Sequence, residues 1–540
     1  MLSTLNRYVF RELLRVFILA SVALTLILSL GSILQPIGEY GVGPRQVVYL
    51  MGYFLPITLT FVLPMAALFS GALVYGRLAS DNELDACRAS GISLPAMTYP
   101  GLVLAMIVAI ANLLLSFYVM PVFVHRAEQS FKADAKQILF RNIQRRRYYE
   151  LPPDSRYLIY ADQANLQNDT LLGVVVTEMK NNQIENIIMA EAAKVTFNTD
   201  PASRTNPTGR TLLQITALNS GQMGAEGEGG AQLGSLTKEV GSLLGDEINF
   251  KKIGEMRKIA NDPMQFYPID QLAREMYAQL IVELLAEDIR RRGPSDPSDQ
   301  YELLGEPNSV KFTARQCQVR DADVVLSGDV LVTEYNTDSK QPLRTQRCAE
   351  ASLHLEGDSL APTLTMDLKS PQEIGSSQLR MRHVISGLHA PNVVEARAAE
   401  FKTRSGSLQP EKLASALSQI PELQPSRSLT SLQTKLERQI RKTLVQIKAE
   451  IHSRLVFGTG CVPMIMIGIG LGILQKGGHL LSAFGASCVP AAVLIICIMS
   501  GKQLTQNLNA QTVSGVTLMW GGLGLLVLLT LGIYTRLLRH

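Results

Sequence analysis

The chain has 540 residues, enough for more than one domain, and 46% of them are hydrophobic. Charged residues make up only 18%, and the formal net charge of +4 is close to neutral, which gives no support to nucleic-acid binding. Nearly all the charged residues lie between Arg126 and Arg454, while long uncharged stretches occupy both ends. This asymmetry indicates a membrane protein with a large soluble part in the middle of its sequence.

Six apolar segments are long enough to span a bilayer, which requires about 20 residues. They cover residues 16–34, 47–75, 99–122, 455–474, 480–500 and 513–535. The first apolar run is too long for a cleavable signal, and no small-residue cleavage site follows it. The expected fold is therefore a membrane α-helical protein, with membrane halves of three spans each at residues 1–122 and 454–540.

Basic residues in the short loops predict the orientation, because Lys and Arg accumulate on the cytoplasmic side. The loops of one side carry only Arg45 and Lys502. The loops of the other side carry Arg7, Arg11, Arg15, Arg77, Arg88, Lys476, Arg536 and Arg539. Both termini are therefore expected in the cytoplasm and the middle domain outside it, which in a bacterial inner membrane means the periplasm.

The cytoplasmic loop of residues 80–93 predicts a short helix with acidic residues at its start. Ser80 or Asp81 can cap its N-terminus, and a glycine can end it. Such a helix is what a membrane subunit offers to a motor subunit, since its carboxylates can pair with basic residues of the partner. An ordinary solvated loop helix is the alternative interpretation. The candidate docking residues are Glu83, Leu84, Asp85, Cys87, Arg88 and Gly91.

Residues 123–453 form the predicted periplasmic domain. Short β-branched runs broken by Asn, Asp and Gly turns predict a β-sandwich or jelly roll. A glycine-rich linker followed by helical patterns indicates a partly helical insertion at residues 221–311. Apolar residues spaced three and four apart over residues 429–453 predict an amphipathic helix that continues into the fourth span. That helix could transmit a tilt between membrane and soluble domain, or simply pack on the sandwich.

Motifs of catalysis and metal binding are missing from the sequence. It contains no HExxH, GxSxG, Walker A or EF-hand pattern, and no CxxC pair or Cys/His cluster, so neither an enzyme nor a metal or cofactor site is expected. Cys317 and Cys348 are the cysteines of the soluble domain, where a disulfide and two buried thiols are both open. No span carries a charged residue near its middle, which disfavours ion-coupled transport and indicates energy from another subunit.

Three segments resemble one known family. The loop at residues 80–93 contains Glu-Leu-x-Ala-x-Arg-Ala-x-Gly-Ile-Ser and resembles the coupling-helix segment of the LptF/LptG lipopolysaccharide-export permeases. Residues 6–14, Asn-Arg-Tyr-Val-Phe-Arg-Glu-Leu-Leu, are similar to that family's opening helix. Glu450-x-His-x-Arg454 resembles the segment entering its fourth span, and the order of three spans, jelly roll and three spans also matches.

The resemblance implies a permease subunit of an ABC-type exporter, without an ATP site of its own. Two such permeases pair, a cytoplasmic ATPase dimer binds ATP and Mg²⁺ and docks on their coupling helices, and lipopolysaccharide or a related lipid moves from the inner membrane through the jelly roll to a periplasmic bridge. An F-like partner, a G-like partner or a homodimer fits these motifs. Acyl chains would then contact the inner face of the β-sandwich, although a closed core is the competing interpretation. The candidate residues are Leu158, Tyr160, Val174 and Val176.

Two other functions stay open. A permease of lipoprotein or drug export usually has four spans with its large domain after the first, so the arrangement of three and three spans argues against it. A non-transporting membrane scaffold or sensor with a periplasmic binding domain needs no capped acidic loop. Co-purification of an ATPase would separate these two classes of function.

Overall fold

The computed structural model describes most of the chain. The described residues are 2–40, 44–150, 157–180, 183–200, 210–224, 229–231, 235–239, 247–292, 300–306, 308–320, 323–337, 341–356, 363–374, 382–405, 425–474, 480–506 and 512–539. Contacts between residues divide the chain into two compact units. Unit 1 comprises Met1–Arg257 and Leu444–His540, and unit 2 comprises Lys258–Thr443.

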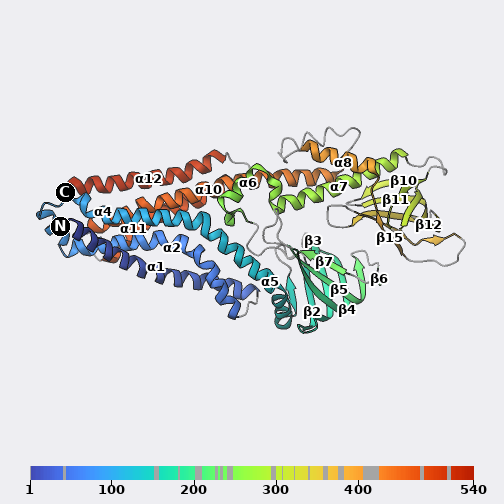
Figure 1. The fold of residues 1–540 in the computed structure, drawn as a ribbon, viewed down its shortest axis with the longest axis horizontal. Helices are drawn as coiled ribbons and strands as arrows, with labels where there is room; N and C mark the ends of the chain where they lie inside the picture. The colour runs from blue at the N-terminus through green and yellow to red at the C-terminus, as the bar shows by residue number, and fades with distance from the viewer. Residues whose placement is uncertain are drawn as a thin grey trace. The chain divides into compact units, whose positions relative to one another are not determined.

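Long apolar helices that run side by side make up most of unit 1 (Figure 1). Six of the described helical stretches are long and apolar enough to cross a membrane, three before the first strand and three after the last, and they match the six predicted segments. The helices of unit 1 are α1 (Leu2–Tyr40), α2 (Pro44–Ser80), α3 (Glu83–Ala89), α4 (Leu94–Leu114), the π-helix η1 (Leu115–Val119), α5 (Met120–Arg146), the 3-10 helix η2 (Ile248–Phe250), α10 (Arg427–Leu474), which begins in unit 2, α11 (Leu480–Gln506) and α12 (Thr512–Arg539).

Close backbone packing joins helices from the two ends of the chain. Gly468 and Gly472 on α10 face α2 at short range. A Cβ atom added at these positions would lie 2.8 Å from the carbonyl oxygen of Leu68 and 2.7 Å from that of Ala72, respectively. Glycine at both positions therefore lets the helix backbones approach, as small residues do in membrane helix pairs.

The first sheet follows α5 and belongs to unit 1. Its strands pair antiparallel in the order β1-β2-β3-β4-β5-β6, and β7 also pairs with β5. One face is covered by α5, because Ala135, Leu139 and Ile143 recur every four residues and pack on buried strand residues such as Ile159. The described strands are β1 (Tyr148–Glu150), β2 (Tyr157–Asn165), β3 (Thr170–Lys180), β4 (Gln183–Asp200), β5 (Arg210–Gly224), β6 (Gly229–Ala231) and β7 (Ser235–Glu239).

Unit 2 contains a second antiparallel sheet. Helix α7 packs on this sheet, against β10 and β11. Its strands pair in the order β15-β13-β12-β11-β9-β8, with β10 on β11 and β14 on β12. Backbone hydrogen bonds from Glu306 to Gly387 (3.0 Å) and from His389 to Leu304 (2.7 Å) join the two ends of this order. The sheet therefore closes toward a barrel instead of leaving two open edges. The described elements are α6 (Ile253–Asn261), which begins in unit 1, η3 (Pro263–Gln265), α7 (Tyr267–Arg292), β8 (Tyr301–Leu303), β9 (Asn308–Thr313), β10 (Gln316–Arg320), β11 (Asp323–Asn336), β12 (Pro342–Glu356), β13 (Thr363–Lys369), β14 (Gln372–Glu373), β15 (Arg382–Leu388) and α8 (Asn392–Ser405).

The described strands form two antiparallel sheets, one in each unit, where the sequence predicts a single β-sandwich or jelly-roll domain. The predicted insertion at residues 221–311 falls in both units, since β6 and β7 belong to the first sheet and unit 2 is Lys258–Thr443. Local patterns identify strands, but the partner of each strand depends on contacts between residues far apart in sequence. The predicted amphipathic segment at residues 429–453 and the fourth predicted span form one helix, α10.

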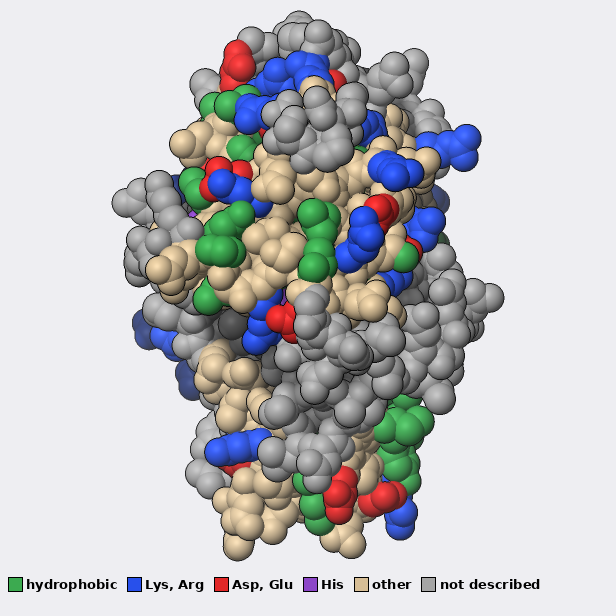
Figure 2. All heavy atoms as spheres, turned by 90° about the vertical axis from the view of Figure 1, so that its right-hand side faces the viewer, with side chains coloured by type: hydrophobic (Ala, Val, Ile, Leu, Met, Phe, Trp, Pro, Cys, Tyr) green, Lys and Arg blue, Asp and Glu red, His purple; other side chains and the backbone are tan. Residues whose placement is uncertain are grey.

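Figure 2 shows one view of the molecule with its side chains coloured by type. Lys and Arg side chains are spread over this face with acidic side chains among them, and the coloured hydrophobic side chains stand in separate small groups. Scattered exposed hydrophobic residues are normal on protein surfaces. The described residues of this face therefore give no reason to infer an apolar docking surface there.

Candidate functional site

The helix predicted between the second and third spans is present as α3. It begins at Glu83, and Asn82 occupies the N-cap position in a left-handed conformation (φ 57°) without a side-chain cap. The prediction that Ser80 or Asp81 caps this helix is wrong. Ser80 is the last residue of α2, and the backbone N–H of Asp81 still donates to Arg77 at 2.9 Å, so only a two-residue turn separates the helices.

Gly91 lies just beyond the end of α3, with a left-handed φ of 81° that favours glycine. Its N–H donates to the carbonyl of Arg88 at 2.9 Å, and the N–H of Ile92 donates to that of Cys87 at 3.1 Å. These are the two hydrogen bonds of a Schellman motif. Ile92 also packs against the same hydrophobic cluster as Cys87, so the end of α3 is fixed by packing and hydrogen bonding together.

One face of α3 is attached to the membrane helices, and the other is open. Leu84 is only 6% exposed and packs in a cluster with side chains of α2 and α4, such as Tyr75. Cys87 and Asp85 are half-buried, whereas Glu83 is exposed. The helix thus presents a carboxylate to solvent while its apolar side holds it in place.

Arg88 connects α3 to the last helix of the chain. Its Nη2 donates a hydrogen bond to the carbonyl oxygen of Leu537 at 3.2 Å. Leu537 lies in the final turn of α12, where carbonyl groups lack a donor within the helix. A cation is also favoured there by the helix dipole. Arg88 therefore links α3 to the end of α12.

The four candidate lipid-contacting residues lie on two faces of the first sheet. Val174 and Val176 are buried, at 2% and 4% exposure, in the cluster beneath α5. Leu158 and Tyr160 are half-buried and point to the opposite face, because alternate residues of a strand point to opposite sides. The structure therefore does not bring the four together, and only Leu158 and Tyr160 lie on the face opposite α5.

Cys317 and Cys348 are free thiols in this structure, so the possible disulfide is not formed. Their strands, β10 and β12, pair with opposite sides of β11. Because neighbouring strands lie about 4.8 Å apart, β10 and β12 are about 10 Å apart, beyond the roughly 7 Å between Cα atoms that a disulfide allows. Burial raises the pKa of each thiol to about 11. Burial therefore favours the protonated thiol at both positions.

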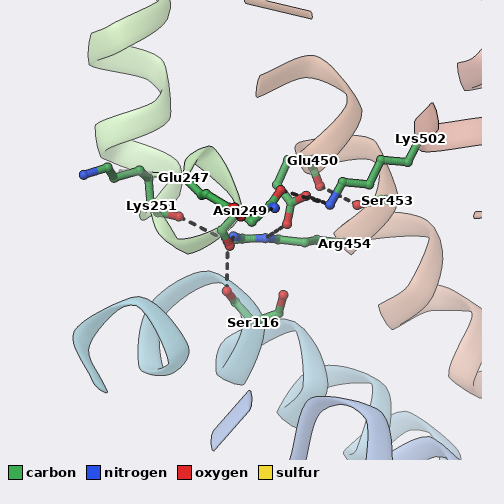
Figure 3. A network of polar contacts seen from close by, with 8 residues as sticks. All are labelled: Ser116, Glu247, Asn249, Lys251, Glu450, Ser453, Arg454 and Lys502. Carbon is green, nitrogen blue, oxygen red and sulfur yellow. Dashed lines mark hydrogen bonds and ion pairs between the residues drawn. The ribbon is translucent and has the colours of Figure 1, made fainter. Parts of the chain in front are cut away.

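A buried polar network surrounds Arg454, whose side chain points from α10 toward η1 and η2 (Figure 3). Its Nε donates to Glu450 Oε1 at 2.9 Å, and its Nη1 donates to the carbonyl oxygen of Ser116 at 2.9 Å. The carbonyl oxygens of Lys251 and Asn249 accept from Nη1 at 3.3 Å and from Nη2 at 2.6 Å. Arg454 thus joins α10 to two segments that are distant in sequence, η1 and the segment around η2.

Lys502 on α11 completes the network. Its Nζ lies 2.6 Å from Glu450 Oε2 and donates to Asn249 Oδ1 at 3.0 Å. Two cations therefore face one buried carboxylate, and the carbonyl oxygens around Arg454 offset the remaining positive charge. Breaking a buried ion pair costs about 3–5 kcal/mol when one charge is left without a partner. Loss of Arg454 alone is expected to cost less, because Glu450 keeps Lys502.

The helix facing Arg454 has an irregular hydrogen-bond register. In η1, which lies between α4 and α5, the N–H of Met120 donates to Leu115, five residues back. Ser116 thereby loses its usual donor four residues ahead, and the next donor in the π-helical register would be residue 121. That residue is Pro121, which has no N–H. Arg454 supplies the hydrogen bond that the helix itself does not provide.

This network is not among the sites predicted from the sequence. Glu450 and Arg454 are separated by four residues and so share one face of a helix, which could have signalled an internal ion pair. Lys502, a single cation at the end of an apolar segment, was a further signal. Asn249 and Ser116 contribute backbone carbonyls, which no sequence pattern specifies.

Unit 1 as a whole defines a multi-pass membrane protein, in which a short surface helix is seated on the span ends and a helix leaving the spans carries an antiparallel sheet. Residues 7–209 match the family model described as lipopolysaccharide export system permease LptF/LptG. The matched segment includes α3 and runs into the first sheet, and it confirms the resemblance seen at residues 6–14 and 80–93. Among curated proteins, none matches the chain.

Proposed function

We propose that the chain is a permease subunit of an ABC-type exporter that takes lipopolysaccharide, or a related lipid, from the inner membrane and passes it to a periplasmic bridge. The family match over residues 7–209 supports the class of transporter. The observation that carries the proposal is α3, a firmly seated helix that leaves Glu83 exposed. A partner ATPase dimer would bind ATP and Mg²⁺, and a second LptF/LptG-like permease would complete the membrane part.

The proposed topology has membrane halves at residues 1–122 and 454–540 and a periplasmic part at residues 123–453. The distribution of Lys and Arg among the loops supports it, with both termini in the cytoplasm. The order of the described elements, three candidate spans on each side of the strands, is in keeping with it. In this topology α3 lies at the cytoplasmic surface, where an ATPase can reach it.

Docking on α3 would be transmitted to both ends of the chain. Leu84 packs against α2 and α4, which precede the first sheet. Arg88 is hydrogen-bonded to Leu537 in α12, the last helix. Because one seven-residue helix touches both groups of spans, a push on it from the ATPase would act on both groups at once.

Lipid acyl chains are proposed to lie on the face of the first sheet opposite α5. Tyr160, Val175 and Met189 are register neighbours on three adjacent strands and form an apolar row, with Met189 48% exposed. Leu158 lies two residues from Tyr160 on the same face. A row of this kind could cover part of an acyl chain, and each CH₂ group removed from water is worth about 0.8 kcal/mol.

Co-purification of the ATPase tests the docking role of α3. Glu83→Ala in the full-length chain should lower ATPase recovery and ATP hydrolysis, because loss of one partner of a buried interfacial charge pair costs about 2–5 kcal/mol. Its thermal stability should match the wild type, since Glu83 is exposed. Asp81→Asn, at a neighbouring exposed carboxylate, is the control. Unchanged ATPase recovery and ATP hydrolysis with Glu83→Ala would exclude α3 as the docking helix. A wild-type chain that recovers no ATPase would favour the scaffold or sensor function.

A further inference from the structure

One continuous helical rod leads from the candidate third span to the first sheet. It consists of α4, η1 and α5, and its first part lies within the candidate span Leu94–Ala127. Its other end carries Leu139, Phe140 and Ile143, which are buried against the sheet. A change of direction within the rod would therefore move the first sheet relative to the spans.

The π-helical turn η1 is the point where the rod can most easily bend. Its hydrogen bonds span five residues, and Pro121 at the start of α5 removes one further donor. Proline and π-helical turns are the common causes of kinks in long helices. The carbonyl of Ser116 depends on a donor from outside the rod, so its hydrogen bond with Arg454 is the contact that can open or close.

Arg454 holds η1 through two neighbouring residues. Its Nη1 donates to the carbonyl of Ser116 at 2.9 Å, and its guanidinium carbon lies 5.6 Å from the ring centroid of Phe117. Charge-assisted hydrogen bonds and cation–π contacts are both strengthened where water is excluded, and the Arg454 side chain is only 4% exposed. The turn is therefore fixed from the side by α10.

The same guanidinium also holds the segment that leaves the first sheet. Asn249 and Lys251, whose carbonyls accept from Arg454, lie shortly after β7, whereas α5 leads into β1. Both connections of the sheet to the helices thus meet at one side chain. We propose that η1 is a hinge between the spans and the first sheet, and that Arg454 is the positioning residue that locks it.

The hinge would also control lipid transfer, a role that rests on the proposed function. If lipid passes from the spans to the first sheet, the sheet must accept it in one orientation and release it in another. An unlocked hinge would allow hydrolysis of ATP to continue without ordered transfer. Arg454→Met should therefore keep ATPase recovery at the wild-type level while lipid transfer falls.

Distance measurements across η1 test the lock directly, without any transport assay. Spin labels at Ile107 and Gln137, both exposed, lie on either side of η1 and about 45 Å apart along an ideal helix. The full-length chain in nanodiscs should give a narrow distance distribution, and Arg454→Met should broaden it. Amide exchange of residues 115–120 should become about tenfold faster in the variant. Arg441→Gln, an exposed arginine of the same helix, is the matched control and should change neither.

A double variant shows whether the broader distance distribution arises because the carbonyl of Ser116 has lost its hydrogen-bond donor. Pro121→Ala restores an N–H that can donate to Ser116, so Arg454→Met should broaden the distribution less in that background. Arg454→Lys keeps the charge and lacks the fork of donors, and it should give an intermediate width. An unchanged distribution and unchanged exchange in Arg454→Met would overturn the hinge lock. A broader distribution together with normal lipid transfer would support the lock and exclude its role in transport.

Discussion

Asn112 on α4 donates a hydrogen bond from its side-chain amide to the backbone carbonyl oxygen of Thr60 on α2, across 2.7 Å. Both residues are buried, at 1% and 6% exposure. The carbonyl of Thr60 lacks its usual helical donor because the residue four positions later is Pro64. A neighbouring helix thus satisfies the group that the proline leaves free, which is what makes proline tolerable within membrane helices.

Asn112→Leu should destabilise the chain by about 1 kcal/mol, because it leaves a buried carbonyl without a donor. Thermal unfolding of the detergent-solubilised protein should show a lower midpoint. In a Pro64→Ala background the loss should shrink, since the alanine would provide an N–H for the carbonyl of Thr60. Equal losses in both backgrounds would show that Asn112 stabilises the helices in some other way.

The helical part of unit 1 was predictable because its signals are local. An apolar run of about 20 residues predicts a span wherever it occurs, and the six predicted segments coincide with six described helices. Gly91 likewise signals the end of α3 through its own backbone freedom. Even here the first residue of the helix was misplaced, because α2 extends to Ser80 and leaves no room for the expected cap.

The pairing of the strands and the backbone partners of Arg454 were not predictable, because they depend on contacts between residues far apart in sequence. Alternating apolar residues identify β2 and β3, but not which residues α5 will cover, so Val174 and Leu158 were assigned to one face. The lock depends on a π-helical turn and on backbone carbonyls at Ser116 and Asn249. Every residue has a backbone carbonyl. Which of these carbonyls lack a donor within their own helix is determined only by the folded structure.

The second sheet contains a partly buried contact between a carboxylate and a histidine that should make its stability depend on pH. His383 Nε2 lies 3.4 Å from Glu334 Oε2, and Asn308 donates to Glu334 Oε1 at 2.7 Å. The hydrogen bond with His383 lowers the pKa of Glu334, burial opposes this, and the contacts with Asn308 and the charge of Arg344 lower it further. Because the pKa of Glu334 is lower in the folded state, its contribution to stability is present above the unfolded value of about 4.3 and is lost as the pH falls through the folded value.

Amide exchange in β11 and β15, corrected for its intrinsic pH dependence, should therefore rise between about pH 5 and pH 3. Glu334→Gln should be less protected at pH 7 and should lose less protection over that range. Glu302→Gln, at a half-exposed carboxylate of the same sheet, is the control and should behave like the wild type. A parallel response of Glu334→Gln and wild type would assign the pH dependence to other groups.

Photo-crosslinking tests whether acyl chains use the face of the first sheet opposite α5. Leu158 and Tyr160 lie on that face, whereas Val174 and Val176 are buried beneath α5 and serve as controls within the same two strands. In cells that make lipopolysaccharide, a photoreactive residue should form lipid adducts at the first two positions and none at the other two, because a chain on the sheet surface cannot reach a packed core. Protein levels identify any control variant that fails to fold. Gln163, which is exposed on β2, provides a further position for the photoreactive residue. Adducts at a position in the spans without any at Leu158 or Tyr160 would mean that the lipid leaves the membrane along another route.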